Sequence, residues 1–387
     1  MNLREKIFQE IREKGPIPFS RYMEICLYDA AHGYYSRNVE QFGKAGDFYT
    51  SSDVHAVFGR LLARQFDEMW RTMGSPEKIG ILELGPGRGL FARDVLAWSE
   101  KKFPAFFRGL HYSLNERSDA LRERLKTTLE RYFAGGKVSF SEQKPPLVGE
   151  LCGADVAASS RGPLIVFANE FFDALPVEVL SLEGELRITE KNGRLAETWV
   201  PASADDLEYL DRYGVHPGDG ERVETARLAY LFMSRLASSI QRGFIVTIDY
   251  GYTRAEQLAG RHRGTVTAYR QHSVSANPYE APGEQDITAH VNFTALAAAA
   301  EQQGMQVQPL LTQAQFLMGI GEANQFADAF EECRLPQEHA KVALQLKHLV
   351  TPAGMGETFH VLVASKGVAA EQAANLVGLS FGNENKK

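Results

Sequence analysis

The stretch KIGILELGPGRGL, residues 78–90, decides the fold. Its apolar run reaches the carboxylate Glu83 and enters a turn that contains Gly85, Gly87 and Gly89, after which LFARDVLAWSEKKF repeats apolar residues at helical spacing. Glycines let backbone amides approach a ligand without a Cβ in the way, and the amino terminus of a helix attracts an anionic group. The stretch therefore predicts a strand, a tight turn and a helix that together bind a nucleotide-like ligand.

The spacing of these glycines separates three kinds of nucleotide site. A dinucleotide-binding dehydrogenase uses G-x-G-x-x-G, whereas here the third glycine comes one position early and Leu90 stands at the expected place. A P-loop is excluded because no Gly-Lys-Ser or Gly-Lys-Thr follows the turn. Glu83 suits a ligand that carries an ammonium group, as the methionine part of S-adenosylmethionine does. The motif therefore favours an S-adenosylmethionine site over an NAD site.

Strand-like and helical segments alternate on both sides of this motif. Further short apolar or β-branched runs are LHYSLNE, KVSFSE, PLIVFANE and GFIVTIDYG, and later MQVQPLL and ETFHVLVAS. Helical patterns such as SDALRERLKTTLERYF separate the first of them. Such alternation is typical of βαβ units, so we expect an α/β fold with a mainly parallel sheet.

The positions of these runs divide the chain. We expect an N-terminal cap or lid at residues 1–76, where helical patches flank a polar segment rich in Gly, Tyr and Asp. A hairpin with Asn192-Gly193 at its turn, followed by a helix, forms an expected insertion at 186–239. The other expected parts are a sheet core built from 77–185, 240–312 and 355–367, a helical insertion at 313–354, and a C-terminal tail at 368–387 that is frayed after Gly378.

Acidic residues end several of the expected strands. In an open parallel sheet the ligand lies outside the carboxyl ends of the strands, so these residues are candidates for the site. Glu116, at the end of LHYSLNE, is placed to accept hydrogen bonds from the hydroxyls of a ribose, and the alternative is a solvated residue at a helix start. Asp249, near the end of GFIVTIDYG, adds a further carboxylate to the same edge.

The loop after PLIVFANE is the expected acceptor site. Asn169 and Glu170 end this strand, and Phe171, Phe172 and Asp173 follow. Carboxylates here can hold a guanidinium or ammonium group through charge-assisted hydrogen bonds, and an aromatic face suits a sulfonium cation. We therefore interpret Glu170 and Asp173 as catalytic candidates, Asn169 and Phe171 as donor-site candidates, and Phe172 as a core residue.

Composition argues against several other functions. The net charge is −7 and the pI is about 5.9, and no stripe of lysine and arginine interleaved with aromatic residues is present, so nucleic acid is not an expected partner. Cys26, Cys152 and Cys333 form no C-x-x-C pair, and no histidine motif suggests a metal site. No window approaches the roughly 18 apolar residues of a membrane span. The first helical stretch carries glutamates that a mitochondrial presequence avoids, so we expect a cytoplasmic protein.

Several segments together resemble the MidA family of methyltransferases. The matching pieces are Leu27-Tyr28-Asp29 with Gly33-Tyr34-Tyr35, GDFYTS at 46–51, LELGPGRG at 82–89, ANEFFDALPVEV at 168–179, IDYGY at 248–252, QDITAHVNF at 285–293 and Met355-Gly356. The resemblance implies a class I, Rossmann-like, seven-stranded and mainly parallel methyltransferase sheet with an N-terminal cap. It also implies S-adenosyl-L-methionine as methyl donor and, as in the family's mitochondrial member, symmetric dimethylation of an arginine in a subunit of respiratory complex I.

The resemblance further implies roles for individual residues. Glu170 and Asp173 would face the acceptor. The donor site would include the positions Glu83, Gly85, Gly87 and Glu116, with Asp47, Phe48 and Thr50 closing over it. Two positions depart from the pattern: Asn292 replaces the family's more usual Asp, and the paired-glutamate loop of other arginine methyltransferases is matched by Glu170 with either Asp173 or Glu178.

Two other interpretations stay open at this point. One is a small-molecule O- or N-methyltransferase built on the same sheet. The other is an assembly factor that binds S-adenosylmethionine and acts mainly by holding a partner subunit. All three interpretations share the donor site, and an intact donor motif without any methylated product would favour the assembly factor.

Overall fold

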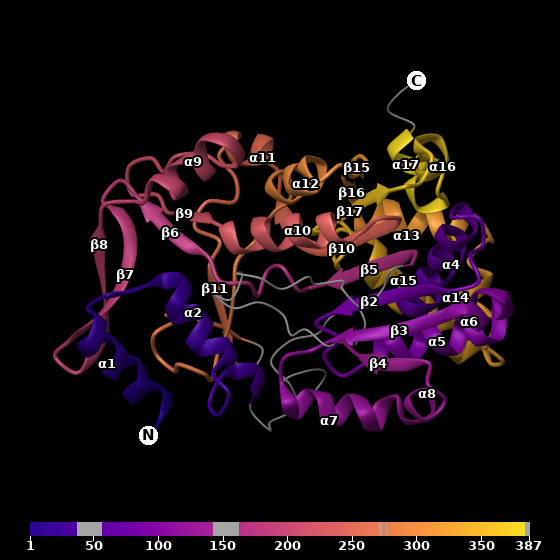
Figure 1. Cartoon of the computed structure of the whole chain (residues 1–387), viewed down its shortest axis with the longest axis horizontal. Helices are drawn as coiled ribbons and strands as arrows, with labels where there is room; N and C mark the ends of the chain where they lie inside the picture. The colour runs from indigo at the N-terminus through magenta and orange to yellow at the C-terminus, as the bar shows by residue number, and fades with distance from the viewer. Residues whose placement is uncertain (37–55, 142–161, 271–272, 276, 384–387) are drawn as a thin grey trace.

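A twisted, mainly parallel sheet forms the centre of the molecule (Figure 1). The computed structural model describes residues 1–36, 56–141, 162–270, 273–275 and 277–383. Within these residues seven strands lie side by side in the order β15, β17, β10, β5, β2, β3, β4. Their bounds are Gln306–Val307, Phe359–Lys366, Gly243–Tyr252, Leu164–Asn169, Ile79–Leu84, Leu110–Asn115 and Val138–Phe140. Two short strands, β14 (Val291–Asn292) and β16 (Leu311–Thr312), pair with β10 and β17.

The directions of the strands confirm the predicted α/β class. From β4 to β10 every neighbouring pair is parallel, whereas β17 is antiparallel to β10. Alternate residues of β5 serve opposite faces: Ile165 and Phe167 pack into one core, and Val166 packs into the other. Because both faces are covered, the parallel strands read as continuous apolar runs, which made them visible in the sequence.

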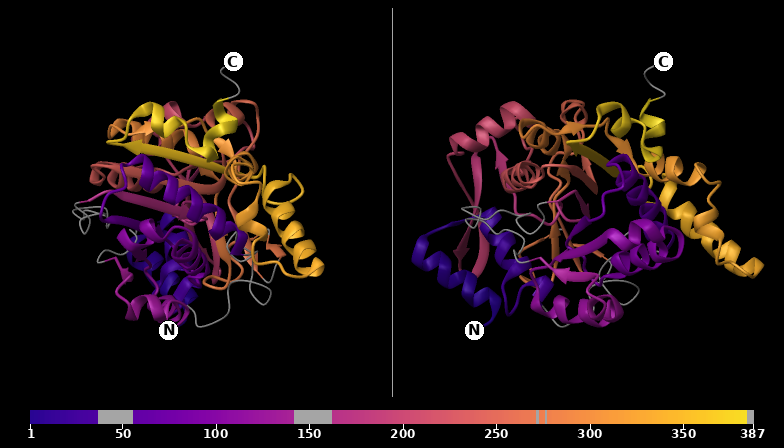
Figure 2. Two further views of the ribbon diagram at one scale, coloured as in Figure 1. Left: turned by 90° about the vertical axis from the view of Figure 1, so that its right-hand side faces the viewer. Right: turned by 45° about the vertical axis from the view of Figure 1, so that its right-hand side comes forward.

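Helices cover the sheet on both faces. One face packs against α4 (Ala56–Thr72), α5 (Leu90–Lys102) and α13 (Gln313–Glu322). The aromatic rings of Phe91 and Phe167 stack there, with their centroids 4.3 Å apart. The other face packs against α10 (Arg227–Ser239) and α12 (Phe293–Gln302). Further helices near the sheet are α6 (Pro104–Gly109), α7 (Asp119–Thr128), α8 (Glu130–Ala134), α14 (Ala327–Phe330), α15 (Pro336–Val350), α16 (Ala370–Ala374), η2 (Val377–Leu379) and α17 (Ser380–Asn383). The orange-yellow α15 projects from the body in Figure 2.

A second lobe lies beside the sheet, at the left of Figure 1. Its five-stranded sheet joins β1 (Ile17–Pro18) to β7 (Gly184–Lys191), with β6 (Glu178–Ser181), β8 (Arg194–Val200) and β9 (Val223–Thr225). The helices α1 (Leu3–Lys14) and α2 (Phe19–Tyr28) pack on it, and α9 (Ala204–Tyr213) adjoins β9. Asn192 and Gly193 both have positive φ, of 53° and 72°, so the predicted hairpin turn between β7 and β8 is confirmed.

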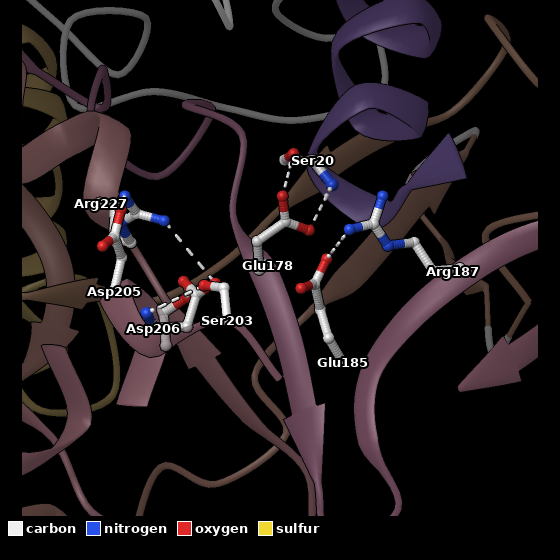
Figure 3. A network of polar contacts seen from close by, with 9 residues as sticks. Ser20, Glu178, Glu185, Arg187, Ser203, Asp205, Asp206 and Arg227 are labelled. Atoms are coloured by element: carbon white, nitrogen blue, oxygen red, sulfur yellow. Dashed lines mark hydrogen bonds and ion pairs between the residues drawn. The ribbon is translucent and has the colours of Figure 1, made fainter. Parts of the chain in front are cut away.

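Buried polar contacts fasten the N-terminal helices to this lobe (Figure 3). Ser20 of α2 donates both its backbone N–H, at 3.2 Å, and its hydroxyl to the carboxylate of Glu178 in β6. On the neighbouring strand Arg187 pairs with Glu185 at 2.9 Å. Together with the pairing of Ile17 and Ile188, these contacts join the N-terminal segment to the second lobe across more than 150 positions of sequence.

A small third sheet connects the second lobe to the main sheet. It pairs β11 (Thr267–Arg270) with β12 (Ser273–Ser275) and with β13 (Asp286–Thr288). The short helices η1 (Tyr34–Ser36) and α11 (Arg254–Leu258) complete the described elements. Directly after β13, the N–H of Ala289 donates to the carbonyl of Asp173 at 2.9 Å. This sheet therefore lies against the loop that follows β5.

Packing differs from the predicted division of the chain at three places. The helix α4 was predicted within the cap at 1–76, yet its apolar face packs on the main sheet against α5. The helix α10, predicted within the insertion at 186–239, covers the other face of that sheet. The tail at 368–387 was predicted to fray after Gly378, which is wrong as far as residue 383: Leu379 is 3% exposed and α17 covers Ser380–Asn383. Apolar contacts over long separations decide all three outcomes.

Candidate functional site

The glycine turn after β2 has the predicted conformation. Gly85, Gly87 and Gly89 have φ of 61°, 51° and 75°, in the left-handed region that glycine adopts without strain. The N–H of Gly85 donates to the carbonyl of Asn115 at 3.1 Å, which ties the turn to the end of β3. Gly85 itself is exposed, and a Cβ there would lie 3.1 Å from the ring of Phe171. The turn therefore presents open backbone at the carboxyl edge of the sheet.

Glu83 lies just before this turn on β2. Its side chain is 4% exposed and accepts a hydrogen bond from the hydroxyl of Tyr112 at 2.8 Å. Burial raises the pKa of Glu83 to about 8, and the Tyr112 hydrogen bond offsets this only in part. In the free protein the carboxyl therefore holds its proton near neutral pH, and a ligand ammonium group would favour the charged form.

This raised pKa makes stability depend on pH. Between the ordinary pKa of 4.5 and the folded value of about 8 the native chain binds more protons at Glu83 than the unfolded chain, so stability falls as pH rises. We expect the free energy of unfolding to drop from pH 6 to pH 8, with about 2 kcal/mol of the drop due to Glu83. In the Glu83→Gln variant the drop between the two pH values should be smaller by that amount. Urea unfolding at both pH values tests this, and equal drops in the two proteins would contradict it.

Glu116 follows β3, beside the glycine turn. It is 8% exposed, and its Oε1 accepts the N–H of Ser118 at 2.7 Å. Ser118 caps α7 by accepting the N–H of Leu121 at 3.3 Å. The carboxylate therefore helps to order the start of this helix, but it is buried and not the solvated residue of the alternative interpretation. Because Leu84 of β2 pairs with Asn115 of β3, the structure also brings Glu116 next to the turn.

The loop after β5 begins with an unusual backbone. Glu170 has φ of 50°, which is uncommon for a residue with a side chain and concentrates at functional sites. Its N–H donates to the carbonyl of Ile248 at 3.0 Å, and Asn169 Nδ2 donates to Glu170 Oε1 at 3.0 Å. Both side chains are half-buried. Glu170 is therefore held at the end of β5 with part of its surface accessible.

Asp249, predicted as one more acidic strand end, instead organises this loop. It is 0% exposed, and its Oδ2 accepts the backbone N–H groups of Phe171, Phe172 and Asp173 at 3.2, 3.0 and 3.4 Å. Its Oδ1 accepts the N–H of Tyr250 at 2.9 Å. Burial, Asp173 and Glu170 raise the pKa of Asp249. The side chain works as a buried anchor that sets the path of the loop after β5.

Removing this anchor should destabilise the fold. Asp249→Ala removes the carboxylate that accepts four backbone N–H groups, three of them in the loop, and a buried unpaired group costs about 1–3 kcal/mol. We expect a loss of about 3 kcal/mol or more in the free energy of unfolding. The matched control is Thr247→Val on the same strand, since the buried Thr247 hydroxyl has no hydrogen-bond partner within the described part of the chain. Similar stability of the two variants in urea would contradict the anchor role.

Asp173 is a deeply buried carboxylate near Glu170. It is 5% exposed, its Oδ2 accepts the hydroxyl of Tyr250, and its Oδ1 is buried with no geometric hydrogen-bond partner among the described residues. Burial raises the pKa of Asp173 to about 6. A buried acceptor without a donor is costly, so such atoms are rare outside functional sites. Asp173 Oδ1 is therefore suited to a cationic hydrogen-bond donor from a ligand.

The two phenylalanines of the loop had different predicted roles, with Phe172 in the core and Phe171 at the donor site. Phe172 is 3% exposed and packs against Phe232, as predicted for a core residue. Phe171 is also buried, at 7% exposed, with its ring 5.3 Å from that of Phe172 in an edge contact. Its contact with Gly85 places it between the glycine turn and the acidic loop. Phe171 therefore links the two candidate subsites, because it belongs to the acidic loop and packs against the glycine turn.

Other predicted positions have different outcomes. Asp47, Phe48, Thr50 and Cys152 lie outside the described residues. Glu178 binds Ser20 in the second lobe, so Asp173 is the carboxylate that lies beside Glu170 in the loop. Asn292 caps α12 by accepting the N–H of Ala295 at 3.0 Å, which is a structural role. Cys26 and Cys333 are free thiols.

Three residues at this edge received no role from the sequence. Tyr28 donates its hydroxyl to the carbonyl of Ala174 at 2.8 Å, and Tyr35 donates its hydroxyl to Asp286 Oδ1 at 2.9 Å. Both tyrosines and Asp286 fall within segments that carried the family resemblance, which was the available signal. In the described part of the chain no group of three metal-ligating side chains is present, and no helix there has the length and apolar character to span a bilayer.

Comparisons with known proteins agree with this geometry. A family model described as S-adenosyl-L-methionine-dependent methyltransferase matches residues 61–311. The chain is 30% identical over 95% of its length to the mitochondrial protein arginine methyltransferase NDUFAF7 homolog of Drosophila melanogaster, covering 86% of that protein, and 26% identical to human NDUFAF7, with 92% and 81% covered. A methyl transferase from Burkholderia thailandensis, crystallised with S-adenosyl-homocysteine, superimposes with a TM-score of 0.81 at 28% identity, over 96% of this chain and 94% of that one.

Proposed function

The chain belongs to the family of S-adenosyl-L-methionine-dependent methyltransferases, and from that premise we propose that it methylates an arginine side chain of a protein. The observation that carries the proposal is the buried, unpartnered Oδ1 of Asp173 beside the half-buried Glu170. The relatives from Drosophila melanogaster and human, which carry the name protein arginine methyltransferase, support it. We further propose symmetric dimethylation and a partner of the respiratory complex I type, as the family resemblance implies.

The residues around the glycine turn fit the donor. S-adenosyl-L-methionine, when bound, supplies an electrophilic methyl group on a sulfonium. The exposed backbone of Gly85, together with Gly87 and Gly89, would receive its amino-acid part, with the carboxyl of Glu83 beneath. Glu116 would accept the ribose hydroxyls. The main contribution of these residues is to hold the donor in one orientation and to exclude water.

The acidic loop would hold and activate the acceptor. A guanidinium is protonated and delocalised, so one nitrogen becomes nucleophilic only when the charge is localised elsewhere on the group. Glu170 and Asp173 would bind two edges of the guanidinium by charge-assisted hydrogen bonds. The acceptor nitrogen gains a methyl group and loses one proton, which a carboxylate oxygen accepts late in the transfer. Glu170, the more accessible of the two, is the candidate for that oxygen.

Labelling of a complete lysate tests this function. A lysate from cells that lack the protein would receive the purified chain and S-adenosyl-L-methionine with a radioactive methyl group. We expect label in one or a few protein bands, with a methylated arginine located by mass spectrometry. Label in small molecules alone would favour a small-molecule methyltransferase. Retained donor binding without any methylated product would favour an assembly factor that holds its partner.

A further inference from the structure

Three contacts fix Asp173 in the loop after β5, and each has a different partner. Its N–H donates to Oδ2 of Asp249 at 3.4 Å, and its carbonyl accepts the N–H of Ala289 at 2.9 Å. Its side-chain Oδ2 accepts the hydroxyl of Tyr250. Asp249 and Tyr250 are adjacent in β10, so one stretch of strand fixes both the backbone and the side chain of Asp173. The orientation of this carboxylate is therefore set by the fold.

Tyr250 is itself held on several sides. Its ring makes edge contacts with Phe359, its partner in the register of β10 and β17, at a centroid distance of 5.6 Å, and with His290 at 5.3 Å. Thr288 of β13 hydrogen-bonds its hydroxyl. Since the one hydroxyl hydrogen of Tyr250 goes to Asp173, Thr288 is the donor in this contact. A hydroxyl that accepts one hydrogen bond donates the next more strongly, so the three side chains form a cooperative chain.

The surroundings of Asp173 make its charge depend on Tyr250. Burial raises the pKa of Asp173 to about 6, and the Tyr250 hydroxyl is the largest influence that lowers it, ahead of the backbone N–H groups of Ala174 and of Asp173 itself. Burial lowers the pKa of His290 to about 4, so this imidazole is neutral where Asp173 titrates. The titratable groups around Asp173 and Tyr250 come from the loop, from β10, from β13 and the residues after it, and from α2, η1 and β11: Glu170, Asp249, Asp286, His290, Tyr28, Tyr35 and Tyr269.

We propose that Tyr250 is a positioning residue of the acceptor site: its hydroxyl holds Oδ2 of Asp173, so that Oδ1 is the oxygen that binds the acceptor cation. The inference rests on the proposed function, because it explains how one carboxylate of that acceptor site is oriented. Oδ1 has no geometric hydrogen-bond partner among the described residues, whereas Oδ2 has the Tyr250 hydroxyl. Without that hydroxyl the charged form of the buried carboxylate loses a donor, so Asp173 would keep its proton to higher pH and attract a cation less.

Tyr250→Phe tests this role, because it removes one hydroxyl and keeps the ring against Phe359 and His290. Two bisubstrate probes join adenosine to an alkyl chain that ends in a charged guanidine or in a neutral urea, and calorimetry on the full chain measures the preference for guanidine from pH 5 to pH 9. The wild type should prefer guanidine by about tenfold or more at pH 8, and less as pH falls below about 6, where Asp173 gains its proton. In Tyr250→Phe this decline should begin about one pH unit higher, with a preference at pH 9 within about threefold of wild type.

Two further variants separate this role from a general loosening of the loop. Tyr28→Phe is the matched control: it removes a hydroxyl that donates to the backbone carbonyl of Ala174 in the same loop, so its decline should begin at the wild-type pH. Thr288→Val removes the donor to Tyr250 and should move the decline in the same direction by a smaller amount, which covers the case that Tyr250→Phe does not fold. No preference for guanidine in the wild type would contradict the proposed function. A wild-type preference whose decline begins at the same pH in every folded variant, or moves equally in Tyr28→Phe, would overturn this inference alone.

Discussion

Replacing Glu170 with glutamine is expected to lower the rate of methyl transfer by about a hundredfold or more, the range of a lost general base. Glutamine keeps the size of the side chain and can still accept the hydrogen bond from Asn169. It carries no charge to localise the guanidinium cation and cannot take its proton. Because the donor would lie on the glycine turn, the affinity for S-adenosyl-L-methionine should change by less than about threefold. Single-turnover kinetics with the labelled donor, beside a calorimetric titration, measures both quantities.

The matched control for this variant is Glu183→Gln. Glu183 is an exposed carboxylate in the turn between β6 and β7, in the second lobe. Its variant should transfer methyl groups at the wild-type rate. Turnover of Glu170→Gln equal to that of the control would remove Glu170 from the reaction. Loss of donor affinity in Glu170→Gln would instead show that this residue belongs to the donor site.

Gly85→Ala should weaken donor binding by about tenfold or more. The backbone at position 85 has φ of 61°, which strains a residue that carries a Cβ. The added methyl group would lie 3.1 Å from the ring of Phe171, on exposed backbone that the donor needs to approach. We expect the dissociation constant for S-adenosyl-homocysteine to rise by about tenfold or more, which corresponds to about 1.4 kcal/mol. Titration calorimetry measures this constant directly.

The chain offers a close control for the backbone strain alone. Gly136 has φ of 66°, and a Cβ there would meet no atom within 4 Å. Gly136→Ala therefore carries a similar left-handed strain, of about 1–2 kcal/mol, without any contact near the donor. It should lose stability to a similar extent and bind S-adenosyl-homocysteine as the wild type does. Equal affinity in the two alanine variants would contradict the assignment of the turn to the donor.

The main sheet and the donor turn could be predicted from local signals. Strands such as LIVFAN and IGILEL are buried on both faces, so their sequences are mainly apolar up to Asn169 and Glu83, and the turn needs glycine at positions with positive φ. These signals lie within a few residues of one another. The same reasoning made Glu170 and Asp173 candidates, because a parallel sheet collects its ligand residues at the carboxyl ends of its strands, and their catalytic roles stay a prediction.

Other parts of the site depend on contacts that no local pattern records. The pairing of Ile17 with Ile188 joins the N-terminal segment to the second lobe, and Tyr35 meets Asp286 across 251 positions. The role of Asp249 was misjudged for a similar reason. A carboxylate at a strand end looks the same in sequence whether it faces a ligand or accepts three backbone N–H groups of a neighbouring loop.

Amino-acid analysis of the labelled product tests the central proposal most directly. The protein band labelled in the lysate would be hydrolysed, and its radioactive residues separated beside methylated standards. We predict that the label elutes with methylated arginine, ending as symmetric dimethylarginine, and that Glu170→Gln gives none although it binds the donor. Label on lysine or on carboxyl groups, or equal labelling by Glu170→Gln, would contradict the account.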